Sequence, residues 1–267
     1  MPDPGIPVPR AATPTLLLYV GSLALWGLAT WLLLGAGVTP WLTVPMHAAV
    51  SFLMFTVLHE ATHHAAGRLT WVNELFGRLA QPFVAGFASF PAFRHIHIEH
   101  HRNTNESRDV DPDAWTTHGP TWQLPLRWMT QDFYYAWFWA PRIRRRPRAE
   151  VVETVALAAA TVGVVGWALV GGWFWQLAVI YLIPQRIGIT VLAWWFDWLP
   201  HHGLTAHHPD NLTNGRDSRP PSPAPTRGVE PARRPSTASL HVLAATNAAP
   251  GGMPPGARGE QRRKRRN

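Results

Sequence analysis

The feature that most constrains this chain is a set of uncharged or nearly uncharged apolar runs that are long enough to cross a membrane. These runs cover residues 15–38, 41–58, 151–170 and 173–196. A helix of about 20 apolar residues spans the hydrocarbon core of a bilayer. Because lipid offers no hydrogen-bond partners to the backbone, the runs predict an all-α membrane protein with four transmembrane helices.

Two further segments are apolar but less regular. Residues 71–90 are interrupted by Glu74, Arg78, Pro82 and Gly86, which favours an interfacial or re-entrant segment over a span. Residues 122–139 are aromatic and amphipathic, which predicts a helix in the headgroup layer. The flanking spans argue against a stacking surface for nucleic acid. Arg186 interrupts the fourth run, and we expect it to face protein or a polar cavity.

The distribution of arginine predicts the orientation of the spans. The connection formed by residues 67–149 carries 11 Arg, whereas the other two connections between runs carry none. The positive-inside rule therefore places this connection and both termini in the cytoplasm. The chain contains no Cys, which excludes disulfides and thiolate chemistry.

Two clusters of histidine stand at helical spacing where apolar runs meet polar sequence. His59 and His63 are four residues apart and share one helical face, which His64 borders. The second cluster consists of His97, His100 and His101, again on one face. Ordinary packing histidines could explain one such cluster more easily than two. Imidazole is a ligand for Fe, Zn, Cu and Ni, so the pair predicts a metal site.

Other polar residues lie on the same predicted side of the membrane. His201, His202, His207 and His208 follow the fourth run. The loop after the second cluster contains alternating aspartates, but Ala114 stands where a calcium loop requires glycine. The loop therefore does not predict a calcium site.

The region from about residue 41 to residue 202 resembles the membrane fatty acid desaturase/hydroxylase family. The resemblance is carried by His59-Glu60-Ala61-Thr62-His63-His64, His97-Ile98-Glu99-His100-His101, the run from Arg102-Asn103-Thr104-Asn105 through Asp109, Asp111, Pro112 and Asp113, and Asp197-Trp198-Leu199-Pro200-His201. It implies a four-span bundle with a cytoplasmic cap that holds two irons on histidines. It also implies O2-dependent removal of hydrogens from an acyl or isoprenoid chain, with electrons from a separate ferredoxin or similar carrier.

Residue by residue, the resemblance implies a set of iron ligands. These are His59, His97, His100, His101 and His201, together with His63, His64 or both. Glu60 and Glu99 have no ligand role in the family pattern, and we expect them, together with Asp197, to orient imidazoles.

The family pattern contains a third box, H-x-x-H-H, that this chain lacks beyond its last apolar run. The pairs His201-His202 and His207-His208 have a different spacing. His202, His207 and His208 are therefore weaker candidates for the remaining ligand positions, and the chain as written is expected to be poorly active.

The composition divides the chain into three regions. Residues 1–14 form a Pro-rich lead that we expect to be disordered, and residues 15–210 form the membrane domain. Residues 211–267 are expected to be a disordered tail, because from Arg216 onward there are nine Pro, ten Arg and no Phe, Tyr or Trp. A shift of reading frame would explain this change, and a natural basic tail is the alternative. The net charge of +8 belongs to this tail.

Three other functions remain open at this point. A carotenoid or alkane hydroxylase of the same family would use the same residues. A membrane zinc protease would use His59, His63 and the intervening Glu60 as an H-E-x-x-H motif, with His207 or His208 as a further ligand. A non-enzymatic remnant or scaffold is the third possibility. We favour a fatty acid desaturase whose partners are an acyl lipid and an electron carrier, not nucleic acid.

Overall fold

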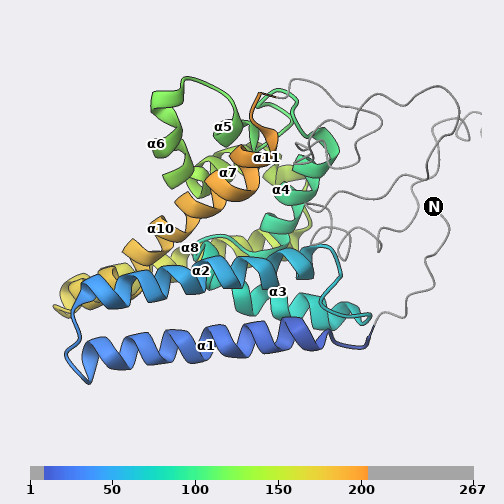
Figure 1. Ribbon diagram of the computed structural model, residues 1–267. Coiled ribbons are helices and arrows are strands. Elements are labelled where there is room, and N and C mark those ends of the chain that lie inside the picture. Colours follow the sequence, from blue (N-terminus) through green and yellow to red (C-terminus); the bar gives the residue numbers. More distant parts are fainter. Residues whose placement is uncertain (1–8, 204–267) are drawn as a thin grey trace, which may run out of the picture.

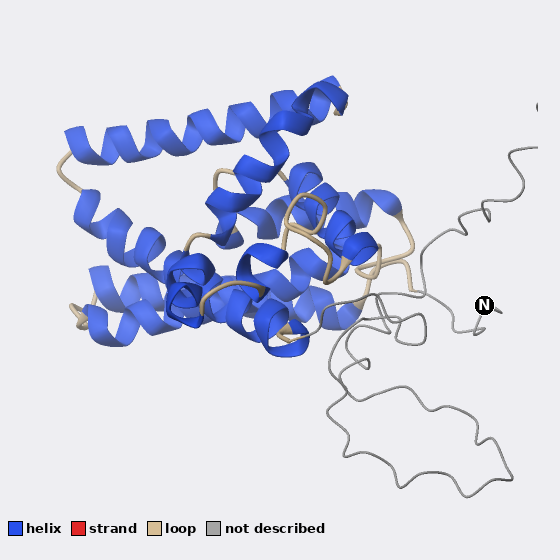
Figure 2. Ribbon diagram, turned by 90° about the horizontal axis from the view of Figure 1, so that it is seen from above, coloured by secondary structure: helices blue, strands red, loops and turns tan. Residues whose placement is uncertain are grey.

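The computed structural model describes residues 9–203, and all regular structure in this part of the chain is helical (Figures 1 and 2). The elements in order are α1 (Thr13–Leu34), α2 (Pro40–Thr62), α3 (Thr70–Val84), α4 (Phe90–Asn103), α5 (Ala114–Thr117), η1 (Thr121–Gln123), α6 (Leu124–Met129), α7 (Gln131–Trp139), η2 (Ala140–Arg145), α8 (Arg148–Val170), α9 (Phe174–Leu177), η3 (Ala178–Leu182), α10 (Ile183–Leu192), η4 (Ala193–Trp198) and α11 (Leu199–His201). The prediction of an all-α protein is confirmed.

Within residues 9–203, four helical segments are long and apolar enough to cross a membrane. They are Thr13–Leu34, Pro40–Thr62, Arg148–Val170 and Phe174–His201. The last segment combines α9, η3, α10, η4 and α11. The segments contain 22 to 28 residues, and at about 1.5 Å per residue each exceeds the hydrocarbon thickness. They coincide with the four predicted spans.

The first two spans form an antiparallel pair (Figure 1). Gly37 adopts a φ of 67° in the connection, a conformation that glycine tolerates without strain. Between the two helices, His47 Nε2 lies 3.0 Å from Thr30 Oγ1, and His47 Nδ1 lies 2.8 Å from the carbonyl of Thr43. Both ring nitrogens of this buried histidine are therefore satisfied within the protein, as a position inside a membrane requires.

The helix α3 is only 15 residues long and is not among the candidate spans. The last turn of α3 and the turn that follows it accept hydrogen bonds from side chains of the fourth and third spans. Tyr181 donates a hydrogen bond to the carbonyl of Pro82, and Thr161 Oγ1 donates to the carbonyl of Gly86 over 3.0 Å. Irregular backbone at membrane depth is tolerated where protein groups satisfy it, so these contacts suit a re-entrant segment.

The aromatic segment 122–139 differs from its prediction. It forms three short elements, η1, α6 and α7, instead of one continuous helix. The break falls at Thr130, with φ −116° and ψ 16°, where the hydroxyl donates to the carbonyl of Leu126 over 2.8 Å. A side chain that bonds its own backbone in this way competes with regular helix, and spacing alone does not reveal that competition.

Arg186 lies in the fourth span, as predicted from the sequence, and faces protein. Its guanidinium forms a two-pronged ion pair with Asp132 of α7 and donates to the carbonyl of Met129 over 2.9 Å. The charge in the span is thus neutralised by a buried carboxylate. The pair joins α10 to α7, and α7 in turn contacts α4 and α5 near the ends of α2 and α11 (Figure 1).

Candidate metal centre

The last turn of α2 places two histidines at the edge of the bundle. His59 lies inside the helix and His63 follows its last residue, with the amide of His63 3.1 Å from the carbonyl of His59. His64 then turns the chain sharply, because its φ is 56°. A residue in this left-handed conformation ends a helix, so His63 still faces the same way as His59 whereas His64 does not join it.

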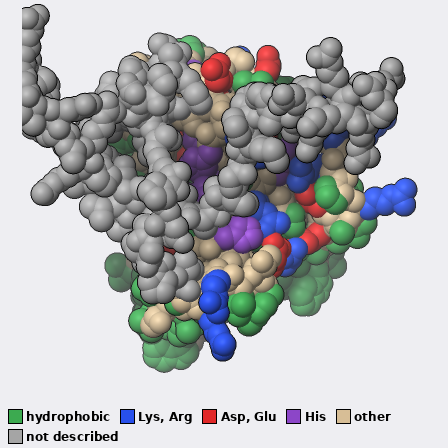
Figure 3. Space-filling model, turned by 90° about the vertical axis from the view of Figure 1, so that its right-hand side faces the viewer, with side chains coloured by type: hydrophobic (Ala, Val, Ile, Leu, Met, Phe, Trp, Pro, Cys, Tyr) green, Lys and Arg blue, Asp and Glu red, His purple; other side chains and the backbone are tan. Residues whose placement is uncertain are grey.

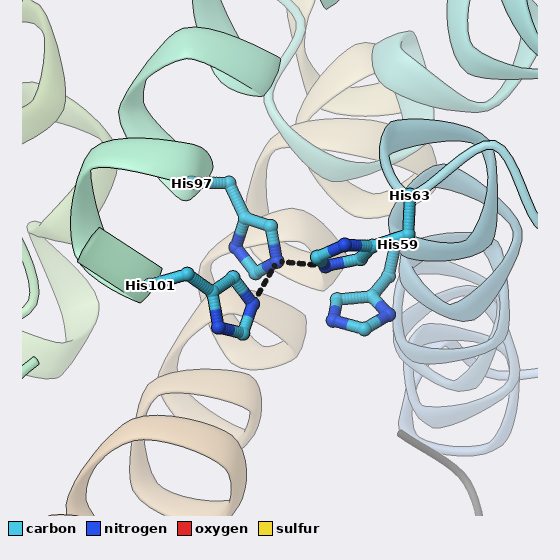
Figure 4. Close-up of side chains that lie close together, drawn as sticks. All are labelled: His59, His63, His97 and His101. Carbon is cyan, nitrogen blue, oxygen red and sulfur yellow. Dashed lines mark hydrogen bonds between the residues drawn. The ribbon is translucent and has the colours of Figure 1, made fainter. Parts of the chain in front are cut away.

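The second pair comes from α4. Ser89 caps this helix by accepting a hydrogen bond from the amide of Ala92 over 3.2 Å, and Pro91 occupies the first turn. The helix then runs without interruption to Asn103. His97 and His101 are four residues apart on its face toward α2 (Figure 4).

These four imidazoles form one cluster, hereafter the four-imidazole cluster, consisting of His59, His63, His97 and His101. One ligand atom from each lies within 4.8 Å of the others. The Nε2 atom of His97 lies 3.0 Å from Nε2 of His63 and 3.0 Å from Nε2 of His101 (Figure 4). Two nitrogens bound at right angles to one metal ion at about 2.1 Å are also about 3.0 Å apart, so the spacing fits a metal position.

The electrostatics of the four-imidazole cluster favour neutral rings. Burial, with a contribution from His64, lowers the pKa of His63 to about 4. Burial and the neighbouring histidines lower the pKa of His97 well below its usual value. The pKa of His101 is lowered for the same reasons, although this ring lies at the exposed edge. Only an unprotonated imidazole nitrogen binds a metal, so the cluster keeps its ligands available at neutral pH.

His100 lies outside the four-imidazole cluster and beside two buried carboxylates. Its Nδ1 is 2.9 Å from Asp111 Oδ1 and 3.4 Å from Asp113 Oδ2. Burial lowers the pKa of His100, but Asp113 and Asp111 outweigh that effect and raise this pKa to about 9. This His/Asp/Asp group is a second place at which side chains could hold a cation.

The remaining predicted histidines are placed differently from one another. His201 is buried, and its ring centroid lies 5.3 Å from that of His100. His202 stacks on Trp198 at 4.1 Å, and its Nδ1 lies 3.0 Å from the Trp198 carbonyl. His207 and His208 fall outside the described residues. The structure thus brings His201 to the site and leaves His202 beside it.

The acidic residues that were expected to orient imidazoles have other partners. Glu60 accepts a hydrogen bond from Thr15 of α1, and Glu99 accepts one from Arg102 over 2.8 Å. Asp197 accepts hydrogen bonds from Thr116 and Gln131 and lies close enough to His100 to raise its pKa. His100 is instead contacted by Asp111 and Asp113, whose alternating spacing was visible in the sequence but predicted no role.

An aromatic layer adjoins the four-imidazole cluster on the side of the spans. Phe93 stacks on His97 at 5.6 Å with an interplanar angle of 10°, and Phe55 lies 5.8 Å from His59. Phe55 also contacts Phe93 and Phe196, at centroid distances of 6.3 and 5.2 Å. Viewed end-on, this end of the molecule shows histidine, Arg and acidic side chains at its surface (Figure 3). The aromatic layer gives the cluster an apolar side toward the spans.

Together, the four apolar spans and the polyhistidine cluster at one end of the bundle define a multi-pass membrane protein with a group of side chains that could hold a metal ion. The sequence profile of the fatty acid desaturase family matches residues 36–227, which include every histidine of the site. The chain belongs to this family of oxidoreductases, which confirms the resemblance. The match continues past Arg216, into the region that composition assigned to the tail. No protein among the curated sequences matches the chain.

The donor set fits the metal that the family typically carries. Iron accepts imidazole nitrogen, and the four-imidazole cluster offers four such donors from two rigid helices. The protease alternative is not supported, because Glu60 of the H-E-x-x-H motif is bound to Thr15 of the neighbouring span. A general base of that mechanism must reach a metal-bound water.

Proposed function

We propose that this protein catalyses the O2-dependent desaturation of a fatty acyl chain in the membrane, with two iron ions and a separate electron carrier such as a ferredoxin. The observation that carries the proposal is the four-imidazole cluster at the end of the apolar spans, in a chain of the fatty acid desaturase family. The orientation that arginine bias predicts puts this site on the cytoplasmic side, where a soluble carrier can reach it.

The reaction is balanced by the electron carrier. One O2 takes two hydrogen atoms from neighbouring methylenes, two electrons from the carrier and two protons, which yields one carbon–carbon double bond and two waters. Bound iron supplies the oxidising chemistry that no side chain can provide. The chain's own residues hold the metal and shape the surroundings of the reacting methylenes.

The residues divide these tasks. His59, His63, His97 and His101 would hold one iron, and His100 and His201 lie where they would contribute to the second. The aromatic layer of Phe55, Phe93 and Phe196 presents an apolar surface on which an acyl chain can lie. Such a layer also excludes water from the reacting bond, which prevents loss of the oxidant in side reactions.

The test is product analysis with the full chain in membranes, supplied with Fe(II), O2 and a reduced ferredoxin. Gas chromatography with mass spectrometry should detect acyl chains that have lost two hydrogen atoms. His97→Ala should abolish the product, whereas Glu106→Gln, an exposed change in the following loop, should not. Gain of one oxygen atom would identify a hydroxylase instead. Zinc at one ion per chain, with neither product, would contradict the proposal.

A further inference from the structure

Three carboxylates, those of Asp111, Asp113 and Asp197, lie near the imidazole of His100. Asp111 and Asp113 are 1% and 3% exposed. Asp113 accepts a hydrogen bond from Tyr135, and Gln131 donates to both Tyr135 and Asp197. Three carboxylates are thus held around one imidazole. Burying carboxylates costs desolvation free energy, so we expect their position to serve a role.

Asp111 is the most firmly held of these carboxylates. Its Oδ1 accepts from the amide of Asp113 and from His100 Nδ1, and its Oδ2 accepts from the amide of Asn105, all over 2.9 Å. The two amides belong to the same loop, so the loop fixes the carboxylate before it meets the imidazole. A side chain fixed in this way can fix the orientation of the ring that it contacts.

A fixed carboxylate can orient the ring of His100, which α4 alone does not direct toward the four-imidazole cluster. This histidine is one residue before His101 and is therefore turned about 100° around the helix from it. Its ring centroid lies 5.5 Å from that of His101 and 5.3 Å from that of His201. A metal ion that binds Nε2 displaces the proton from that nitrogen and leaves the imidazole with its proton on Nδ1, beside Asp111. The contact with Asp111 therefore selects Nε2 as the metal-binding nitrogen.

We propose that Asp111 is a positioning residue that holds His100 with its proton on Nδ1 and its Nε2 directed at the second metal position. This inference rests on the proposed dinuclear centre. In this proposal Asp111 acts through His100 and does not itself bind the metal, because its Oδ1 already accepts from the ring and from one loop amide and its Oδ2 is held by another. Asp113, 3.4 Å from the same nitrogen, supports the arrangement.

The experiment is a titration of the metal-stripped full chain in detergent with Co(II), followed by its visible absorption. With Co(II) in excess, the wild-type protein should bind two equivalents, the second more weakly than the first because fewer histidines lie at that position. Asp111→Asn should leave the first equivalent unchanged and weaken the second by about 10- to 100-fold, the effect typical of a residue that orients a ligand. Asp109→Asn, an exposed change in the same loop, is the matched control and should bind like the wild type.

A double-mutant cycle separates positioning from other roles. His100→Ala should weaken the second equivalent at least as much as Asp111→Asn, and the double variant should bind like His100→Ala alone. Additive losses, or a larger loss in Asp111→Asn than in His100→Ala, would identify Asp111 as a direct ligand and overturn the proposal. A parallel loss of both equivalents with a lower unfolding temperature of the metal-free protein would show a structural role only.

The outcome is distinguishable from a failure of the proposed function. If the chain binds two Co(II) equivalents and the double-mutant cycle gives the expected result, but no desaturated product forms, the proposed function is refuted and the positioning role of Asp111 is retained. Equal titrations for the wild type and Asp111→Asn would remove the positioning role and leave the function. A wild-type chain that binds only one equivalent would overturn the dinuclear centre and the inference together.

Discussion

His97 is the central residue of the four-imidazole cluster, since its Nε2 contacts both His63 and His101 at 3.0 Å. We expect His97→Ala to weaken the first metal by more than about 100-fold, beyond the effect of residues that only orient ligands. His64→Ala should bind the first metal normally, because His64 lies past the helix end with a φ of 56°. Metal analysis after dialysis against a graded chelator would check both variants, and equal losses would show that His64 is a ligand.

The lowered pKa of His97 also predicts how the free energy of unfolding of the metal-free protein depends on pH. Burial keeps the pKa of His97 well below 6.5, so below pH 6.5 the unfolded chain binds a proton that the folded protein does not. This difference lowers the free energy of unfolding as pH falls. In metal-free protein, His97→Gln should reduce that slope by up to about 1.4 kcal/mol per pH unit. Unfolding monitored by circular dichroism between pH 7 and 5 would test this, and identical slopes would contradict it.

At the scale of elements, the sequence predicted the spans well because length and apolarity alone define a segment that lipid accepts. The same information could not predict the break at Thr130, which depends on a hydroxyl bonding its own backbone. It also gave the faces of His59/His63 and His97/His101 from helical spacing. It could not separate His100 from them, because the partner of His100 is Asp111, which reaches it through a folded loop.

The turn after α3 gives a prediction at this scale. A Cβ at Gly86 would clash with the Tyr181 hydroxyl, and that hydroxyl is bound to the Pro82 carbonyl. Gly86→Ala should therefore destabilise the protein by about 1–3 kcal/mol, as overpacking does. Gly163→Ala in α8 is the control, since a Cβ there meets nothing within 4 Å. Thermal unfolding in detergent would compare the two, and equal stability would show that the turn rearranges freely.

At the scale of the whole molecule, arginine bias predicts that the histidine site and both termini are cytoplasmic. The chain contains no native Cys, so single introduced cysteines report their side without background. Ser107→Cys lies in the exposed loop after α4, and Ala36→Cys lies in the exposed connection between α1 and α2. An impermeant thiol reagent outside intact cells should label only the second. Labelling of the cysteine at residue 107 from outside would show that the predicted orientation is wrong.

The boundary between the membrane domain and the tail is a further feature of the whole chain. The sequence predicts a domain boundary near residue 210 and a change of character from Arg216, whereas the family match continues to residue 227. The end of the membrane domain near residue 210 therefore stays a prediction from composition. An Arg/Pro-rich stretch shows that it cannot build a core of its own, but it does not show where the family's domain ends.

The missing third box leads to the last prediction. The four-imidazole cluster gives one position a full set of nitrogen donors, whereas His100 and His201 leave the other with few. Metal affinity depends on the number of ligands and on how rigidly they are held. We therefore expect the purified chain to contain fewer than two irons and to turn over slowly, as measured by elemental analysis and product formation. Replacing the residues after 210 by a segment with an H-x-x-H-H box should raise both. Two tightly held irons and rapid turnover in the unaltered chain would show that His202, His207 and His208 complete the second position.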